Sequence, residues 1–251
     1  MAMSDKSEKF IAIAIGLALL GAIVAWRTLS TPDYTGPGGA TGALTSTVLA
    51  EKEAPEGYKA QTSYFFNSIE GLQAVELGKL ELRDSAQELE RMKSRKEDSA
   101  PVRNLELKLG ANATVLGPVE DVPDAGVGKM LATLYLVHSG VFPTEHVSQR
   151  HQSACVVVEV DAQGAAAAGG LRVGDVWVGV DDLDTLATQP VDPCKEVGTR
   201  VKAAQPGSTL KLIVLRGKAR VELEVKKATE SLKFVAIPVP VLDSDRAGTP
   251  K

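Results

Sequence analysis

The side chains that could carry out chemistry are few in this sequence of 251 residues. Its three histidines, His138, His146 and His151, fall within 14 positions, and Glu145 precedes the second of them. Histidine and carboxylate groups bind metals, but this spacing matches no typical ligand set, so solvated loop histidines are the favoured interpretation. The chain contains neither a His-Glu-x-x-His motif nor a Gly-Asn-Ser-Gly-Gly nucleophile motif. We therefore predict no enzymatic activity, no metal and no cofactor.

The two cysteines, Cys155 and Cys194, are too few for a disulfide scaffold and form no zinc motif. Cys155 begins a strand-like run and Cys194 begins a helix-like segment. In an oxidising compartment a disulfide between them would tie that helix to the sheet. Closing a loop of about 40 residues would contribute roughly 3–4 kcal/mol. The sequence leaves two interpretations open, a disulfide and two buried free thiols, because it does not show whether the Cα atoms approach within about 7 Å.

The elements that must position these cysteines lie between Ala154 and Lys227, where apolar residues alternate as in half-buried strands. The predicted strands are Cys155–Val160, Val176–Val180, Thr209–Leu215 and Ala219–Val225, and the predicted helix is Cys194–Ala204. Gly170 is expected to end a short helical turn, because glycine readily takes a positive φ. The Asp175 carboxylate is expected to accept hydrogen bonds from nearby backbone amides.

Three short motifs lie among these segments: Ala-Gly-Gly-Leu-Arg-Val-Gly-Asp at 168–175, Pro-Gly-Ser at 206–208 and Val-Leu-Arg-Gly-Lys at 214–218. Their order resembles a PDZ domain of the bacterial type, as found in HtrA-type proteases, site-2 proteases and secretion proteins. The resemblance implies a partly open β-barrel with two helices. We expect this PDZ-like domain to span residues 127–228, beginning with a strand at Met130–Val137.

The resemblance also implies a groove that binds peptides. A glycine in its carboxylate-binding loop lets backbone amides converge on a terminal carboxylate. The strand after the loop would then pair with an extended peptide, opposite the helix. A polar stretch at 143–153 departs from this pattern and indicates either an insertion or a degenerate groove. The expected groove residues are Ser139, Gly140, Val141 and Phe142 in the loop, Val197 and Val201 on the helix, and Arg200 at the rim. The competing interpretation is that the apolar ones are simply core.

An apolar run without charge or proline extends from Phe10 to Trp26. As a helix it would be about 26 Å long, enough to span a bilayer. The favoured interpretation is one transmembrane anchor at 10–27, with Phe10 at its start and Trp26 and Arg27 at the interface. A cleaved signal peptide and a buried core helix are the alternatives. Two lysines precede the run, so we expect residues 1–9 in the cytoplasm and the remaining chain exported from a bacterial inner membrane.

Three further regions complete the chain. Residues 28–62 are rich in Pro, Gly, Ser and Thr, which is typical of a flexible linker. Residues 63–126 are expected to form a small mixed region near the membrane. Residues 229–251 are expected to be an extended or disordered tail, in which two prolines exclude a central strand from Phe234–Leu242.

The mixed region contains three predicted elements. Phe65, Phe66, Ile69 and Leu72 have helical spacing. Ser85 and Glu88 form a capping box before a polar helix at Ala86–Glu97. Leucines alternate with charged residues from Leu105 to Leu109, which predicts a strand.

The net charge of −4 and an aromatic content of 4% argue against binding to nucleic acid. The predicted fold is α+β, with one transmembrane helix, an irregular linker, a small mixed region and a C-terminal PDZ-like domain. The predicted function is binding or scaffolding of other envelope and membrane proteins, with a C-terminal or strand peptide as ligand. The alternative is a structural subunit of an envelope assembly, such as a secretion-system inner-membrane component. Its PDZ-like domain would then dock without a peptide.

Overall fold

The computed structural model describes residues 44–60, 62–123, 127–140, 142–143, 153–227 and 232–247. All of them belong to one compact unit, Gly42–Lys251, with a mixed α+β fold. The predicted anchor, with Phe10, Trp26 and Arg27, lies outside these residues. Within the described ranges, no helix is both long enough and apolar enough to cross a membrane.

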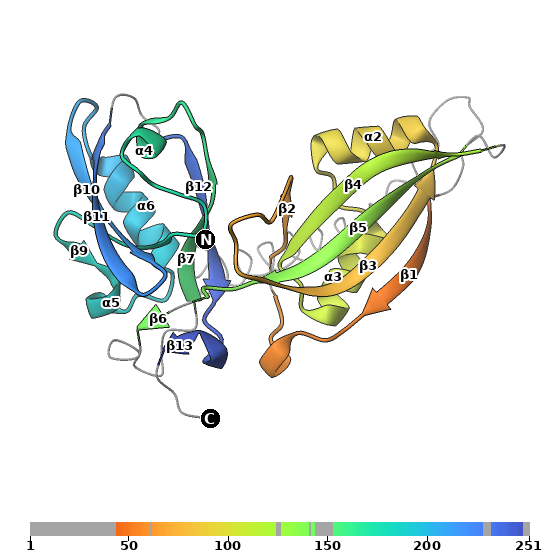
Figure 1. The fold of residues 1–251 in the computed structure, drawn as a ribbon, viewed down its shortest axis with the longest axis horizontal. Helices are drawn as coiled ribbons and strands as arrows, with labels where there is room; N and C mark the ends of the chain where they lie inside the picture. The colour runs from red at the N-terminus through yellow and green to blue at the C-terminus, as the bar shows by residue number, and fades with distance from the viewer. Residues whose placement is uncertain are drawn as a thin grey trace, which may run out of the picture. The chain divides into compact units, whose positions relative to one another are not determined.

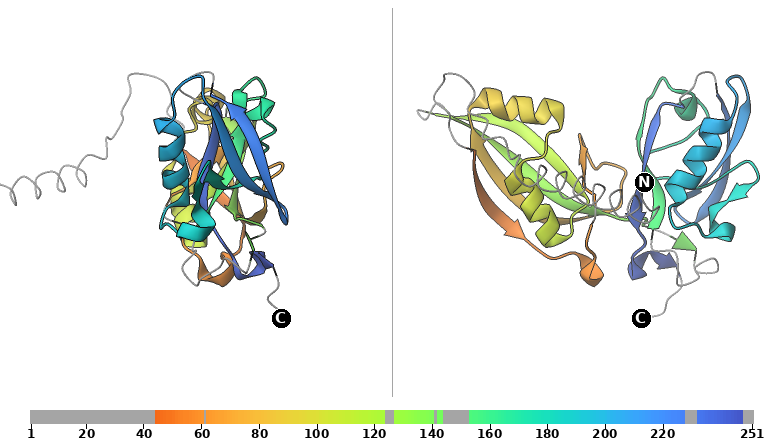
Figure 2. Two further views of the ribbon diagram at one scale, coloured as in Figure 1. Left: turned by 90° about the vertical axis from the view of Figure 1, so that its left-hand side faces the viewer. Right: turned by 180° about the vertical axis from the view of Figure 1, so that it is seen from behind.

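The first half of the unit is a five-stranded sheet with the strand order β1-β3-β5-β4-β2 (Figure 1). Helices α2 and α3 lie on one face of it in both Figure 1 and Figure 2. Leu89 of α2 and Leu105 of α3 pack in one core with Leu80, Leu82 and Leu134 of the sheet. The elements are β1 (Thr45–Glu51), η1 (Pro55–Gly57), β2 (Tyr64–Phe66), β3 (Ala74–Asp84), α2 (Ala86–Arg95), α3 (Ala100–Leu109), β4 (Ala113–Val122) and β5 (Val127–Val137).

Helix α2 confirms the prediction of a capped polar helix. The Ser85 side chain accepts a hydrogen bond from the Glu88 N–H at 3.3 Å, and Lys96 ends the helix in the left-handed conformation. Its thin apolar edge, Leu89 and Met92, is buried against the sheet.

Two other predictions in this region were wrong. Leu105–Leu109 is the last part of helix α3 and not a strand, because apolar residues at helical spacing begin earlier, at Val102. Val102, Leu105 and Leu109 are buried, while Leu107 is 50% exposed. The predicted helix through Phe65, Phe66, Ile69 and Leu72 is replaced by strand β2, which pairs in parallel with β4. Three residues that pair with a distant strand carry too little local pattern to be recognised.

The strand predicted at Met130–Val137 is present within β5, but it belongs to the first sheet. It pairs with β3 on one side and β4 on the other. The first sheet therefore continues to Val137, and residues 127–137 do not open a PDZ-like domain as predicted. Alternation of apolar residues shows that a segment is a strand, but not which strands are its neighbours.

The second sheet has the strand order β11-β10-β8-β7-β12, with β9 beside β8. Helix α6 lies across one face of it (Figures 1 and 2). The elements are β6 (Phe142–Pro143), β7 (Ser153–Val160), α4 (Ala165–Ala168), β8 (Val176–Val180), β9 (Leu183–Asp184), α5 (Thr185–Thr188), α6 (Pro193–Ala203), β10 (Thr209–Arg216), β11 (Ala219–Lys226), β12 (Phe234–Pro240), η3 (Asp243–Asp245) and β13 (Arg246–Ala247). The four strands and the helix predicted here are confirmed.

Both faces of β7, in the second sheet, are mostly buried. On β7, Cys155 and Val157 point to the core beneath α6, while Val156 and Val158 point to a second core that includes Val137 of β5. Alternating side chains point to opposite faces of a strand, so one strand contributes to two cores. This explains why β7 is almost uniformly apolar.

The C-terminal segment is structured where a tail was predicted. Strand β12 pairs antiparallel with β7 from Phe234 to Pro240 and is the last strand of the sheet. An edge position agrees with the expectation from its prolines. After it, η3 and β13 follow, and β13 pairs in parallel with β6. Of the two expectations for residues 229–251, an extended strand is therefore present at β12, and the described residues remain structured as far as Ala247.

Asp245 holds this segment in place, and it is almost fully buried, at 3% exposed. One carboxylate oxygen lies 2.7 Å from His138 Nδ1, and the other accepts hydrogen bonds from the Ser139 hydroxyl at 2.8 Å and the Leu242 N–H at 3.0 Å. Burial alone would raise the pKa of Asp245. The bonds from His138, Leu242 and Ser139 and the charge of His138 outweigh burial and lower the pKa below the ordinary value of 3.8.

A carboxyl group whose pKa is lowered on folding stabilises the fold above its unfolded pKa of about 4, and that stability is lost as the pH falls through the lower, folded pKa. We therefore expect Asp245→Asn to reduce the free energy of unfolding by about 1–3 kcal/mol at pH 7. The deficit should shrink in urea unfolding at pH 3. The matched control is Asp243→Asn, whose side chain is 75% exposed and should matter little. Equal deficits at both pH values would contradict this account.

Candidate functional site

A cleft of about 380 Å³ lies between helix α6 and strand β12. Its walls come from the helix on one side and from the end strand of the second sheet on the other. Lys202 is the only charged residue among those described as lining it. The lining residues are Cys155, Trp177, Cys194, Gly198, Val201, Lys202, Leu232, Phe234, Val235 and Ala236.

Helix α6 is fixed at both ends. At its start, Asp192 accepts a hydrogen bond from the Lys195 N–H at 3.0 Å, and Pro193 occupies the first turn, where no N–H is needed. At its end, the ammonium of Lys227 donates to the carbonyls of Val201 at 2.8 Å and Ala204 at 2.6 Å. Lys227 is only 2% exposed, so its charge is satisfied by the carbonyl end of the helix.

A disulfide joins Cys155 of β7 to Cys194 in the first turn of α6, with a Cα–Cα distance of 4.9 Å. Of the two interpretations left open by the sequence, the structure has the bonded one. Because both cysteines line the cleft, the bridge sets the spacing between helix and sheet at one end of it.

The cleft has aromatic walls. The ring of Trp177 meets the ring of Phe234 edge-on, with a centroid distance of 5.1 Å and an interplanar angle of 72°. The Trp177 indole N–H donates to the Gly179 carbonyl at 2.9 Å, so this polar atom is satisfied within the protein. Edge-to-face pairs of this kind are stabilising.

The outer edge of β12 faces no other strand in the described part of the chain. The Lys233 carbonyl accepts from the Asp161 N–H beside β7, whereas the Pro240 carbonyl accepts from the Ser139 N–H on the other side. Since backbone groups alternate along a strand, even-numbered residues of β12 present theirs outward. Phe234 and Ala236 can therefore donate hydrogen bonds at this edge, while Pro238 can only accept one.

The residues just before β12 were not recognised as part of a site. Leu232, Lys233 and Phe234 form a hydrophobic–lysine–hydrophobic triplet, and Lys233 has a φ of 58°, in the left-handed region that usually favours glycine. A glycine-based search overlooks it. The available signal was two hydrophobic residues on either side of one polar residue, directly before a strand.

The residues predicted for the carboxylate-binding loop lie elsewhere. Ser139 is bonded to Asp245 and to the Pro240 carbonyl, and Phe142 is 2% exposed in the core. A side chain at Gly140 would collide with Gln73, at 2.4 Å, so this glycine is required by packing. None of the three lines the cleft, and Val141 lies outside the described residues. The prediction of this segment as the groove loop does not agree with the geometry.

The residues predicted on the helix separate into three environments. Val201 lines the cleft, although it is only 8% exposed. Val197 is fully buried in the core beneath the helix, which is the competing interpretation. Arg200 pairs with Asp182 and does not line the cleft.

The Gly-Asp turn and the Arg-Gly turn of the recognised motifs meet in one buried ion pair. Both Asp175 carboxylate oxygens accept from the Arg216 guanidinium, at 2.8 and 2.7 Å, and the guanidinium also donates to the Gly170 carbonyl at 2.7 Å. The Arg172 N–H donates to Asp175 at 2.9 Å, as predicted for this turn. Asp175 is only 2% exposed. These motif residues are therefore structural.

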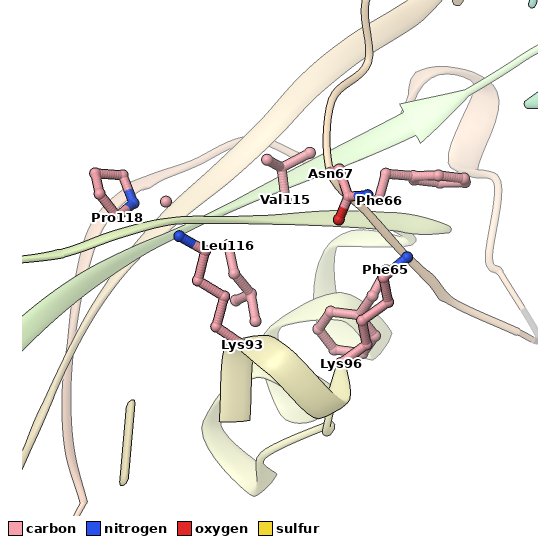
Figure 3. Close-up of a pocket in the computed structure, with 9 residues that line it drawn as sticks. Phe65, Phe66, Asn67, Lys93, Lys96, Val115, Leu116 and Pro118 are labelled. Atoms are coloured by element: carbon pink, nitrogen blue, oxygen red, sulfur yellow. The ribbon is translucent and has the colours of Figure 1, made fainter. Parts of the chain in front are cut away.

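Two other places in the first half of the unit hold polar groups. A cavity of about 340 Å³ beside β4 is lined by Phe65, Leu116, Lys93 of α2 and Lys96 at the end of that helix, and Lys93 reaches from the helix toward Leu116 (Figure 3). Glu106 is buried, which raises its pKa, an effect only partly offset by hydrogen bonds from Ser63 and Thr114.

Across the described ranges, no three His, Cys, Asp or Glu side chains gather as a metal site. His146 and His151 lie outside those ranges.

A helix facing the free edge of an outer strand, across an apolar cleft, defines a module that can bind extended peptides by strand addition. Residues 140–226 match the family model described as PDZ domain. This segment is therefore similar to a PDZ domain, as its motifs predicted, and PDZ domains generally bind peptides or other proteins. No curated protein matches the chain. The match includes α6 but ends before β12, so one wall of the cleft lies outside it.

Proposed function

We propose that this protein binds extended peptide segments of other envelope proteins in the cleft between α6 and β12, without catalysis. One observation carries the proposal: the outer edge of β12 lies across an apolar cleft from α6, a helix of the segment that matches the PDZ family. An incoming strand would pair with Phe234 and Ala236 while its side chains contact the helix.

The C-terminal end of the bound peptide is proposed to lie near Lys233. The PDZ family places a hydrophobic–glycine–hydrophobic loop before its peptide-pairing strand, and Leu232-Lys233-Phe234 has this pattern with lysine in the left-handed conformation. Lys202 at the carbonyl end of α6 adds a positive charge close to the same end. A carboxylate of the ligand would be attracted there.

The proposed setting is the bacterial inner membrane. It is supported by the apolar run at 10–26, the two preceding lysines and the linker-like composition of 28–43. A disulfide between Cys155 and Cys194 is also the state expected of an exported domain, since oxidising compartments preserve such bonds.

The test uses the full chain in detergent and peptides selected from a random library with free C-termini, with binding measured by fluorescence anisotropy. Ala236→Pro removes one outward N–H donor but none that faces β7. We expect it to weaken peptide binding about tenfold or more, because the ligand then loses a backbone hydrogen bond. Ala236→Ser, which keeps the donor, is the matched control.

Equal binding by the proline and serine variants would show that no strand pairs at this edge. A structural role in an envelope assembly would then gain support. One observation favours that second function: all seven residues of edge strand β1 are exposed, with Val48 at 49% and Leu49 at 55%. Exposed apolar edges are typical contact surfaces. Partners that co-purify equally with both variants would point to it.

A further inference from the structure

Gly198 contributes no side chain to the face of α6 that lines the cleft. It lies one turn after Cys194 and about one turn before Val201 and Lys202, all of which line the cleft. A Cβ atom at this position would meet no heavy atom within 4 Å. Neither a positive φ nor a close neighbour therefore requires glycine here.

Glycine in a helix interior is unfavourable compared with alanine, because it loses more conformational freedom on folding. The buried residues of α6 are Pro193, Val197 and Val201, all of them bulkier than glycine. The missing side chain thus weakens the helix and enlarges the cleft at the same point. This combination is expected at a position that provides space in the cleft at the cost of helix stability.

The space opposite Gly198 has a defined chemistry. Trp177, Phe234 and the Cys155–Cys194 bridge supply aromatic rings and sulfur atoms, and Val201 supplies an aliphatic surface. Aromatic side chains interact favourably with other rings and with sulfur. Among the described lining residues there is no carboxylate, and Lys202 is the one cation.

We infer that Gly198 determines the specificity of the cleft by admitting a large aromatic side chain of a peptide, next to a carboxylate that faces Lys202. The inference rests on the proposed peptide-binding function and specifies its ligand. A terminal carboxylate and an Asp or Glu side chain beside the aromatic residue share the same chemistry. The test must distinguish them.

The probes are fluorescein-labelled hexapeptides of one Gly-Ser background. One set ends in Phe, Val or Ala with a free C-terminus, a second set is the same but amidated, and one further probe carries an internal Asp-Phe pair. Anisotropy with the full chain in detergent should rank Phe above Val and Ala. A Gly198→Leu variant should bind the Phe probe about tenfold more weakly, with little change for the Ala probe.

Two further variants keep the test interpretable. Gly198→Ala should fold at least as stably as the original protein and retain most of the Phe preference, because one methyl group fills little of the space. Lys202→Met should weaken the carboxylate-bearing probes and leave the amidated ones unchanged. Loss of binding on amidation of the Phe probe would identify the terminal carboxylate. If amidation changes nothing while the internal Asp-Phe probe binds more tightly than either Phe probe, the carboxylate is that of a side chain.

The inference is overturned if Gly198→Leu, with an unchanged unfolding midpoint, retains the preference for Phe or weakens all probes equally. In that case Ala236→Pro would still weaken binding, and the proposed function would stand. If neither the library peptides nor these probes bind the original protein, the proposed function fails together with the inference.

Discussion

Replacing Cys155 and Cys194 together by alanine is expected to lower the free energy of unfolding by about 3–4 kcal/mol. The bridge spans 39 positions of sequence and contains α4, β8, β9 and α5 within its loop. Without it, the unfolded chain gains conformational freedom, and α6 loses its covalent link to β7. Urea unfolding followed by circular dichroism would measure the change.

Reduction of the original protein by dithiothreitol provides a second route to the same state. The reduced protein should unfold near the midpoint of the double alanine variant, while the reductant should leave that variant unchanged. The prediction fails if the oxidised, reduced and double-variant proteins share one midpoint, since the bridge would then contribute nothing to stability.

The second large effect is expected from Arg216→Met. The substitution leaves the carboxylate of Asp175 buried without its charged partner, and removing one member of a buried pair costs about 3–5 kcal/mol. The Gly170 carbonyl would lose its donor as well. The turns at 170–175 and 216–218 would then no longer be held together. Thermal and urea unfolding would report the loss.

A second ion pair in the same sheet offers a control. Arg220 lies 2.9 Å from Asp184, whose side chain is 28% exposed, whereas that of Asp175 is only 2% exposed. Arg220→Met should therefore cost less than about 1 kcal/mol. Combining Arg216→Met with Asp175→Asn should cost less than the sum of the two single changes, because the second change removes the stranded charge. An Arg216→Met variant as stable as Arg220→Met would refute the structural role of this pair.

Much of the PDZ domain could be predicted from the sequence because its signals are local. Alternating valines and leucines identified β8, β10 and β11, and the capping pattern at Ser85 identified α2. The turn at Gly174-Asp175 was recognised with its backbone acceptor role. In each case the residues that determine the conformation are close together in the chain.

The errors have a common physical origin. Leu105–Leu109 alternates like a strand, but burial of Val102 and Leu105 beneath the first sheet selects the helix. Met130–Val137 has the pattern of a strand in any sheet, and pairing with β3 and β4 places it in the first one. Local periodicity describes one face of a segment, whereas the partner of that face is determined by the whole fold.

The candidate site shows the same contrast between local sequence signals and pairing that depends on the whole fold. By itself the sequence determined the PDZ motifs, helix α6, the strand character of Cys155–Val160 and the edge position required by the prolines of Phe234–Pro240. Only the tertiary structure decided that β12 pairs with β7 and becomes the second wall of the cleft, that Ser139 and Phe142 lie elsewhere, and that Cys155 and Cys194 are joined. Pairing between strands so far apart in the chain is set by the hydrogen-bonding edge and apolar face that remain uncovered once the rest of the sheet has formed, and no local pattern encodes that choice.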